Sequence, residues 1–327
     1  MEIRCIIYAA FLLLSLASTA RTESSFIDLI ENITITVVYD NNYYDPRLQT
    51  DWGFSCIIEF GATAILFDTG ANQSILMGNM AELGIDVSKI QAIVLSHIHA
   101  DHVNGLFAVL ERNPNAKVYM LASFPESFKT QTEAYGCSVI EVQDAMEILP
   151  NILTTGELGT IIREQSLIIS TVKGAIVVTG CAHPGVVQIV EKARELVDDE
   201  IYLVLGGFHL ASYSPASIEY IIGRLRGLGV VKVAPCHCTG DVARTMFNDA
   251  YRDNYVEAGV GKIINIFSFG DINDDGLVDL LDLRIAANAF GSCLGHEKWN
   301  ANVDMDNNHK IDIIDICKIA KQFGANA

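Results

Sequence analysis

The feature that most limits what this chain can fold into is a histidine-rich stretch that directly follows a short apolar run. Residues 92–95 are predicted to form a buried strand, and the chain continues as Ser96-His97-Ile98-His99-Ala100-Asp101-His102. In a loop at a strand end, His97 and His99 can converge on one metal ion while Asp101 and His102 turn toward a second. The imidazoles suit zinc, and the carboxylate widens the choice to iron or manganese. Packing without a metal is a poor explanation for so many ligand types in one loop.

Three further histidines occupy equivalent places later in the chain. His183, His209 and His237 each follow an apolar run that is predicted to be a strand. Functional side chains tend to lie on loops that a rigid sheet positions, so histidines at several strand ends favour one shared metal site.

The chain from 33 to 267 alternates apolar runs with amphipathic stretches, which predicts sheet layers covered by helices. The predicted strands are 33–39, 55–60, 64–67, 92–95, 167–171, 175–179, 202–205, 230–234 and 262–266. The predicted helices are 74–83, 185–197, 215–226 and 241–251. A Lys-Gly pair between the strands 167–171 and 175–179 predicts a hairpin there. The fold class is therefore α/β.

Residues 268–327 form a second region, with ten acidic residues against five basic ones and an internal duplication. Two twelve-residue loops begin at Asp271 and Asp304, and both place oxygen-bearing side chains at positions 1, 3, 5, 9 and 12, as in an EF-hand calcium loop. The sixth position is Gly276 in the first loop and His309 in the second, which predicts a strained or weaker second loop. The expected calcium ligands are Asp271, Asn273, Asp275, Asp279, Asp282, Asp304, Asp306, Asn308, Asp312 and Asp315.

Each loop is predicted to continue into a helix, 283–290 and 316–323, and each helix is followed by glycine. A solvated acidic surface would explain one such loop, but not two in register with matching helices. The join over 267–270 is short, so the two regions are expected to lie close together.

The N-terminus predicts export. Residues 1–20 contain an early Arg4, an apolar centre over 6–14 and the small-residue exit Ser18-Thr19-Ala20, the pattern of a secretory signal peptide. The apolar centre is shorter than the roughly 20 residues that a spanning helix needs, although an uncleaved anchor remains the alternative. The expected location is extracellular, either secreted or associated with the cell surface.

Without Cys5 in the leader, seven cysteines remain, and an odd number leaves at least one thiol unpaired or facing a metal. Cys293 and Cys317 could form a bridge. Cys181, Cys236 and Cys238 flank the candidate ligands and could be soft ligands or a disulfide, while packing is the favoured interpretation for at least two of them. The formal charge of −18 argues against a nucleic-acid partner.

The histidine pattern resembles the metallo-β-lactamase fold superfamily over about residues 33–266, as does the strand end Leu66-Phe67-Asp68-Thr69-Gly70. The Thr-Gly-Cys-Ala-His-Pro-Gly block at 179–185, the Gly-Gly-Phe-His block at 206–209 and the Cys-His-Cys-Thr-Gly block at 236–240 are similar to a dihydropterin-aminobenzene-phosphate synthase-like subgroup. The resemblance implies an αββα sandwich over residues 30–267, with the metal site at one edge.

By this resemblance, His97, His99 and His183 would bind one ion of Zn²⁺, or Fe or Mn, and Asp101, His102 and His237 a second. Asp68 would stand behind the ligands and orient a histidine. The sequence departs from the superfamily at residues 206–209, where most members carry a bridging aspartate. Two-metal occupancy is therefore open, and His209 either binds one metal or contacts substrate.

The implied activity is that of a metal-dependent hydrolase. A divalent ion lowers the pKa of bound water toward about 7, and the resulting hydroxide could attack a carbonyl or phosphoryl centre. Asp101 and His237 are the expected catalytic residues. Tyr43, Tyr44 and Trp52 lie in a loop that could cover a substrate, although simple surface packing is the commoner role for such aromatics.

The duplicated loop–helix pair over residues 268–327 resembles a type I dockerin domain, a small all-α module. This resemblance implies two Ca²⁺ ions, calcium-dependent folding and docking to a cohesin on a scaffold or surface protein. Leu280, Leu281, Ile313 and Ile314 match the partner-contacting positions of that family. The alternative is a calcium-stabilised appendage without a partner. For the whole chain, the alternatives to a tethered hydrolase are a pterin-related transferase and a non-catalytic binding component.

Overall fold

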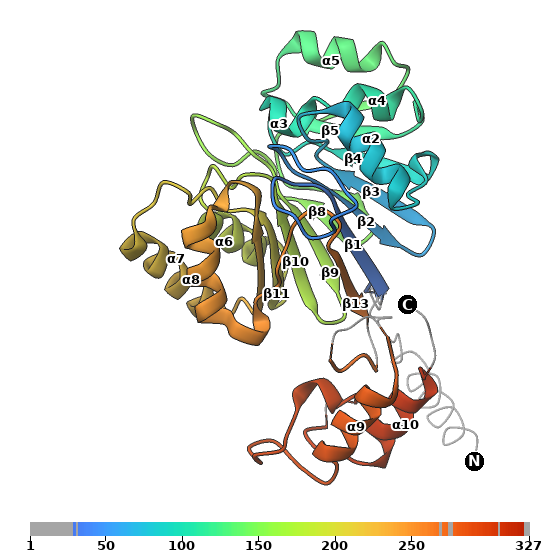
Figure 1. Ribbon diagram of the computed structural model, residues 1–327, viewed down its shortest axis with the longest axis vertical. Helices are drawn as coiled ribbons and strands as arrows, with labels where there is room; N and C mark the ends of the chain where they lie inside the picture. Colours follow the sequence, from blue (N-terminus) through green and yellow to red (C-terminus); the bar gives the residue numbers. More distant parts are fainter. Residues whose placement is uncertain (1–28, 31, 268–269, 274–276, 307, 324–327) are drawn as a thin grey trace, which may run out of the picture.

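The computed structural model describes residues 29–30, 32–267, 270–273, 277–306 and 308–323. Two β-sheets pack face to face and helices cover their outer sides, which confirms the expected αββα sandwich (Figure 1). The predicted signal peptide lies outside the described residues.

The first sheet has the strand order β13-β1-β2-β3-β4-β5-β6. Strand β13 returns from the end of the sandwich to pair antiparallel with β1, whereas β3, β4, β5 and β6 are mutually parallel. The strands are β1 (Asn32–Tyr39), β2 (Ser55–Phe60), β3 (Thr63–Phe67), β4 (Ile90–Val94), β5 (Lys117–Leu121), β6 (Val139–Val142) and β13 (Ile263–Phe267). The associated helices are α2 (Gln73–Glu82), α3 (Ala100–Val103), α4 (Leu106–Leu110) and α5 (Glu126–Glu133).

The second sheet has the order β12-β11-β10-β9-β8-β7. Its strands are β7 (Met146–Leu149), β8 (Ile152–Thr154), β9 (Leu167–Thr171), β10 (Gly174–Thr179), β11 (Ile201–Gly207) and β12 (Lys232–Cys236). Helices α6 (Val186–Leu196), α7 (Pro215–Gly227) and α8 (Asp241–Tyr251) cover its outer face (Figure 1). Strands β10, β11 and β12 are parallel, so the loops that follow them emerge at one edge of the sheet.

The core explains why both faces of β10 are apolar. Ile176 and Val178 belong to the cluster between the two sheets, while Ala175 and Val177 belong to the cluster beneath α6, α7 and α8. Side chains alternate between the faces of a strand, so a strand buried on both sides is apolar at successive positions. The predicted hairpin of β9 and β10 is present, with Thr171 opposite Gly174.

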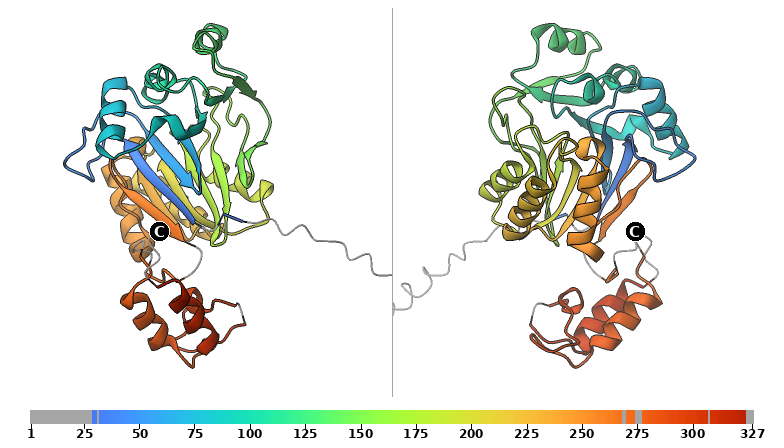
Figure 2. Two further views of the ribbon diagram at one scale, coloured as in Figure 1. Left: turned by 90° about the vertical axis from the view of Figure 1, so that its right-hand side faces the viewer. Right: turned by 60° about the vertical axis from the view of Figure 1, so that its left-hand side comes forward.

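In the described part of residues 268–327, helices α9 (Leu280–Ala289) and α10 (Ile313–Lys321) pack side by side (Figure 2). Their core contains Ala286, Val303 and Ile319. Both begin three residues before the predicted starts, because Asp279 and Asp312 act as N-caps. Cys293 and Cys317 are free and exposed, as opposed to bridged.

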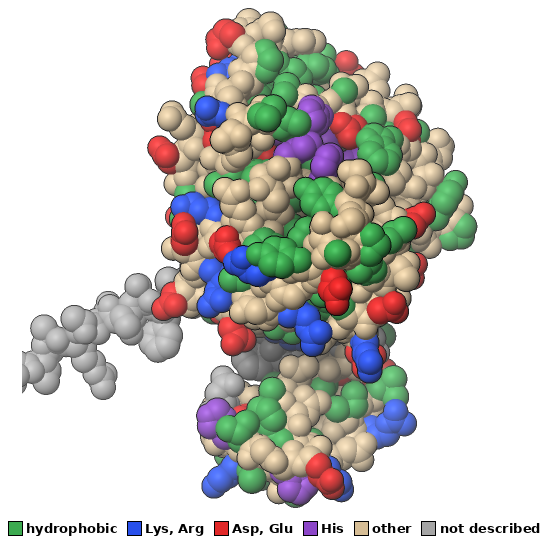
Figure 3. All heavy atoms as spheres, turned by 90° about the vertical axis from the view of Figure 1, so that its left-hand side faces the viewer, with side chains coloured by type: hydrophobic (Ala, Val, Ile, Leu, Met, Phe, Trp, Pro, Cys, Tyr) green, Lys and Arg blue, Asp and Glu red, His purple; other side chains and the backbone are tan. Residues whose placement is uncertain are grey.

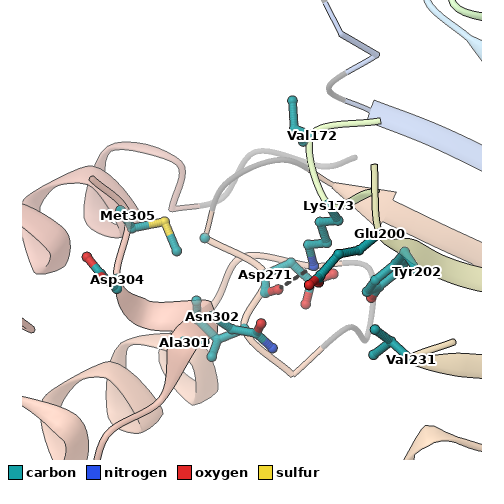
Figure 4. A pocket seen from close by; sticks show the side chains of 12 residues that line it. Val172, Lys173, Glu200, Tyr202, Val231, Asp271, Ala301, Asn302, Asp304 and Met305 are labelled. Carbon is teal, nitrogen blue, oxygen red and sulfur yellow. Dashed lines mark hydrogen bonds between the residues drawn. The ribbon is translucent and has the colours of Figure 1, made fainter. Parts of the chain in front are cut away.

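The two regions approach each other around a pocket of about 410 Å³ (Figure 4). Lys173, Glu200 and Tyr202 line it from the sandwich, and Asn302 and Met305 line it from the C-terminal region. The Lys173 ammonium donates to the carbonyl oxygen of Asp271 at 3.5 Å. The proximity that the short join predicts is thus observed.

Among the helices that the structure describes, none combines the length and the apolar character needed to cross a bilayer.

Candidate metal centre

The histidine-rich stretch lies where β4 ends, and the later histidines approach it from the second sheet. His97 follows β4, His99 precedes the first turn of α3, and Asp101 and His102 lie within α3. The loops after β10, β11 and β12 carry His183, His209 and His237 to the same edge. Histidine side chains gather on this face among apolar ones, as Figure 3 shows.

The three residues expected to hold the first metal are close together. The ring centroid of His97 lies 4.6 Å from that of His99 and 4.7 Å from that of His183, and the rings of His99 and His183 are 4.9 Å apart. These residues come from both sheets, so the sandwich itself assembles the cluster.

The residues expected to hold a second metal form an adjoining group. Oδ2 of Asp101 lies 3.5 Å from Nε2 of His102 and 3.4 Å from Nε2 of His237. Cys181 also belongs to this group, because its Sγ lies 3.2 Å from Nε2 of His102. The sequence alone allows both a ligand role and simple packing for this thiol.

Four of the histidines are held through Nδ1, which directs Nε2 toward the cluster. The pairs are His97 with Ser96 Oγ (2.8 Å), His102 with Asp68 Oδ2 (2.7 Å), His183 with Glu164 Oε2 (2.9 Å) and His237 with Asn41 Oδ1 (2.9 Å). Nε2 of His97 and Nε2 of His237 are buried and have no hydrogen-bond partner. Buried polar atoms are normally satisfied, so the two orphaned nitrogens fit a transition-metal site.

Asp68 lies behind the candidate ligands, the position that the family resemblance implies. Besides contacting His102, its carboxylate accepts hydrogen bonds from the backbone N–H and the hydroxyl of Ser96, both at 2.7 Å. Ser96 in turn contacts Nδ1 of His97, so one buried carboxylate supports histidines in both groups.

Glu164 plays a comparable part and was missed from the sequence. Its buried carboxylate contacts Nδ1 of His183 and accepts the backbone N–H groups of Cys181, Ala182 and His183 at 2.8, 2.8 and 2.9 Å. Although burial opposes ionisation, the hydrogen bonds from His183 lower the pKa of Glu164. A lone glutamate in the loop before β9 carries no sequence signal for this role.

The electrostatics favour neutral rings at three of the candidate ligands. Burial and the neighbouring His102 lower the pKa of His97 well below its usual range, and burial and His237 lower the pKa of His102 to about 3. Burial also lowers the pKa of His99. Metal ions bind the deprotonated ring nitrogen, so these three side chains are in their ligand form at neutral pH.

Asp101 is the negatively charged member of the cluster. Its partial burial opposes ionisation, but the imidazoles of His237 and His102 beside it outweigh that effect and lower the pKa of the carboxyl. Asp101 therefore presents a carboxylate to the two histidines over the whole neutral range.

The backbone around the site is held in unusual conformations. Asp68, Ala182, His209 and His237 all have positive φ, between 48° and 56°. Non-glycine residues rarely adopt this left-handed region, and strained residues of this kind concentrate at functional sites. The surrounding sheets hold the strand-end loops in place against this cost.

Of the three loop aromatics, Trp52 is the one placed over the cluster. Its ring centroid lies 4.9 Å from that of His237, and half of the side chain is exposed. Tyr44 instead covers the Lys262 ammonium, 4.6 Å from its ring centroid, and the backbone of Tyr43 bridges to Val260.

The two candidate calcium loops share one arrangement. The carboxylate at position 12, Asp282 or Asp315, accepts the backbone N–H of position 2 and that of position 9. Asp304, Asp306 and Asp315 bring carboxylate oxygens within 4.8 Å of one another. In the first loop Asp271 is buried, the backbone N–H of Asn273 donates to Oδ1 of Asp282 at 3.2 Å, and Asp275 falls outside the described residues. In the second loop Oδ1 of Asn308 accepts the N–H of Lys310 at 2.8 Å, and Asp312 caps α10.

The second loop shows the strain that its sequence predicts. His309, at the place where the first loop has glycine, has a φ of 62°. Its N–H donates to Asp304 Oδ2 at 2.8 Å, which fixes the turn.

The four expected partner-contacting side chains are apolar and accessible. Leu280 and Leu281 are 71% and 41% exposed at the start of α9, and Ile313 and Ile314 are 61% and 50% exposed at the start of α10. The duplication thus places equivalent apolar pairs at equivalent helix starts.

Known proteins match both regions. The profile of the metallo-β-lactamase superfamily matches residues 53–164, and that of the dockerin type I domain matches residues 269–324. The chain is 30% identical, over 288 residues, to the 7,8-dihydropterin-6-methyl-4-(β-D-ribofuranosyl)-aminobenzene-5'-phosphate synthase of Methanocaldococcus jannaschii, covering 73% of this chain and 98% of that protein.

Among solved structures, a metal-dependent hydrolase of the β-lactamase superfamily is similar, with 26% identity and a TM-score of 0.60 over 71% of this chain and 98% of the other. The metallo-β-lactamase fold protein YhfI from Bacillus subtilis, with 13% identity and a TM-score of 0.56, covers 72% of this chain and 99% of its own, and supports the fold alone.

Proposed function

Because this chain belongs to the metallo-β-lactamase superfamily, we propose that it is an exported metal-dependent hydrolase whose C-terminal dockerin tethers it to a cohesin. The observation that carries the hydrolase proposal is the pair of buried, unpartnered Nε2 atoms of His97 and His237, each in a ring whose Nδ1 is already held. His97, His99 and His183 would hold one ion, and Asp101, His102 and His237 would hold another, with zinc, iron or manganese as the candidates.

When bound, such an ion would polarise the substrate oxygen and lower the pKa of a water molecule. The protein's own contribution begins with Asp101, whose ionised carboxylate would accept a hydrogen bond from the attacking water. His237 lies 3.4 Å from Asp101 through Nε2, so a proton could pass between these two groups. Asn41 fixes the ring of His237 from the other side, and Trp52 covers it, which would limit the access of bulk solvent.

Metal analysis combined with a panel of ester, lactone and phosphodiester substrates tests this proposal. We expect the purified protein to carry a transition metal, and His97→Ala to lose both metal and turnover. Asp101→Asn should lower turnover at least about a hundredfold, the usual contribution of a positioned acid–base group. His296→Ala changes an exposed histidine in the C-terminal region and is the matched control. Protein without a metal, or fully loaded protein that hydrolyses nothing in the panel, would contradict the proposal.

A second candidate is a pterin-related transferase, which the 30% identity with the M. jannaschii synthase favours. The predicted export argues against it, because intracellular cofactor precursors would not reach the protein. Full metal loading together with turnover of a dihydropterin and an aminobenzene ribosyl phosphate, but of no hydrolase substrate, would replace the first proposal with this one. Full loading without any turnover would favour a non-catalytic binding component.

For the C-terminal region we expect calcium-dependent binding to a cohesin through Leu280, Leu281, Ile313 and Ile314. Burying these apolar side chains against a partner would remove their surface from water, which favours association. Leu280→Asp combined with Ile313→Asp should abolish capture by an immobilised type I cohesin, and chelation of calcium should abolish capture of the unmodified protein. Folded, calcium-loaded protein that no cohesin from a diverse set retains would favour a stabilising appendage.

A further inference from the structure

The sandwich leaves no room for a side chain where most members of the superfamily carry the bridging aspartate. A Cβ atom on Gly206 would overlap the carbonyl oxygen of Thr179. A Cβ atom on Gly207 would lie 2.6 Å from the carbonyl oxygen of Gly180 and 2.7 Å from Sγ of Cys238. Contacts below 3.0 Å are essentially never seen for Cβ atoms, so the end of β11 cannot supply a bridging ligand.

A sulfur atom occupies the middle of the cluster instead. Sγ of Cys181 lies within 4.8 Å of the ligand atoms of Asp101, His102 and His237, and it is also within 4.8 Å of those of His97 and His183. The side chain is buried, and its Sγ contacts the second group at Nε2 of His102, 3.2 Å away. Cys181 is thus common to both ligand groups.

From this placement we propose that Cys181 is a metal ligand, and that its thiolate is shared between the two ions in place of the missing carboxylate. The inference rests on the proposed metal centre and adds the residue that joins its halves. On metal binding, the thiol would lose its proton to solvent and the sulfur lone pair would form the bond to the ion, with no change of oxidation state. A thiolate is a soft ligand, so the site would prefer zinc or iron to manganese.

Cys238 has a supporting position. Its Sγ lies 3.4 Å from Sγ of Cys181, a distance at which its S–H can donate a hydrogen bond to the thiolate. A donated hydrogen bond stabilises a charged acceptor, so Cys238 would act as a positioning residue. Cys236 is equally buried and lies next to His237, but it belongs to none of the candidate ligand groups in the described part of the chain. It therefore provides a matched control.

Cobalt substitution tests the assignment without relying on activity. Apoprotein with all thiols reduced, as counted by thiol titration, is loaded with Co²⁺, and the absorption spectrum is recorded. We expect a near-ultraviolet sulfur-to-cobalt charge-transfer band in the unmodified protein and in Cys236→Ser. The band should be absent from Cys181→Ser, while visible cobalt bands from the remaining ligands persist. Cys181→Asp should bind the same number of ions as the unmodified protein but show no charge-transfer band. In this variant the ratio of zinc affinity to manganese affinity should fall at least tenfold.

The outcomes separate the two proposals. Cobalt binding without a charge-transfer band, or a band that survives in Cys181→Ser, would overturn the role of Cys181 and leave the metal centre standing. A Cys181–Cys238 disulfide that persists under reducing conditions would also overturn it. Failure of the unmodified protein to bind cobalt at all would remove the metal centre and this inference together. Far-ultraviolet circular dichroism of each variant shows whether a lost band reflects a lost fold.

Discussion

Oε2 of Glu164 lies 2.9 Å from Nδ1 of His183, because the two residues flank the hairpin of β9 and β10 and its antiparallel pairing brings both flanking loops to the same end. The same carboxylate holds three successive backbone N–H groups in the loop that carries Cys181 and His183. One buried side chain therefore sets both the path of this loop and the direction of the His183 ring.

This relationship predicts a metal-binding defect in Glu164→Gln. Residues that orient metal ligands typically contribute a factor of about 10 to 100 in affinity. A glutamine cannot accept all of these hydrogen bonds as a carboxylate does, so zinc affinity, measured by competition with a chromogenic chelator, should fall within that range. Glu157→Gln alters a glutamate that pairs with Arg163 and should leave the affinity unchanged. Equal affinities for the two variants would contradict the role of Glu164.

The lowered pKa of His102 predicts a pH-dependent stability of the apoprotein. The folded-state pKa of about 3 lies below the unfolded value of about 6.5, so acidification protonates the unfolded chain first and stability falls with falling pH. Between pH 7.5 and pH 5, this group alone should cost about 2 kcal/mol. Urea unfolding of metal-free protein and of His102→Gln at both values measures the difference. Between the two pH values, the free energy of unfolding of the variant should fall by about 2 kcal/mol less than that of the unmodified protein. Equal decreases would show that His102 has an ordinary pKa in the folded protein.

The position of Trp52 predicts an optical signal of metal binding. Its ring lies 4.9 Å from His237, so a paramagnetic ion such as Co²⁺ in the cluster should quench its fluorescence. The other tryptophan, Trp299, belongs to the C-terminal region. Quenching on cobalt addition should therefore persist in Trp299→Phe and disappear in Trp52→Phe. The reverse pattern would place the ion elsewhere.

The backbone of His309 predicts that the second calcium loop can be improved. A residue with a Cβ atom at a φ of 62° carries a cost that glycine avoids, of about 1 kcal/mol. His309→Gly should therefore raise the affinity of this loop for calcium about fivefold, as measured by calorimetry on the full chain. Lys310→Gly is the control: it introduces a glycine one residue later, where no backbone strain is relieved, and should not raise the affinity for calcium. A weaker loop in His309→Gly would mean that the imidazole itself contributes to binding.

The convergence of the later histidines could be predicted because it depends on two regular properties of strands in a sheet. Ligand-type residues followed apolar strands, and parallel strands bring their carboxyl ends to one edge, so His183, His209 and His237 were expected together at one edge of a sheet. Their approach to the stretch from His97 to His102 was expected from the family resemblance. The sandwich and the helix pair of the C-terminal region followed from periodicity and from resemblance in the same way.

Other parts of the site depend on contacts that have no local pattern. Glu164 reaches the cluster because the backbone N–H of Gln165 donates to the carbonyl oxygen of Ser96 at 2.9 Å, which draws the loop before β9 against the end of β4. Strands β7 and β8 have four and three residues, too few for alternation to identify them, and they went unpredicted together with β5, β6 and α5. The place of Cys181 between the two ligand groups likewise depends on how the sheets pack.

In Figure 3 the histidine cluster lies in the upper part of the sandwich, while the C-terminal region, which carries α9 and α10 in Figure 1, lies at the lower end of the molecule. The region that would bind a scaffold is thus remote from the candidate metal centre. A docking protein bound there would not obstruct the approach of a substrate. An enzyme held in this way would keep the face that carries its histidines clear of the protein that holds it.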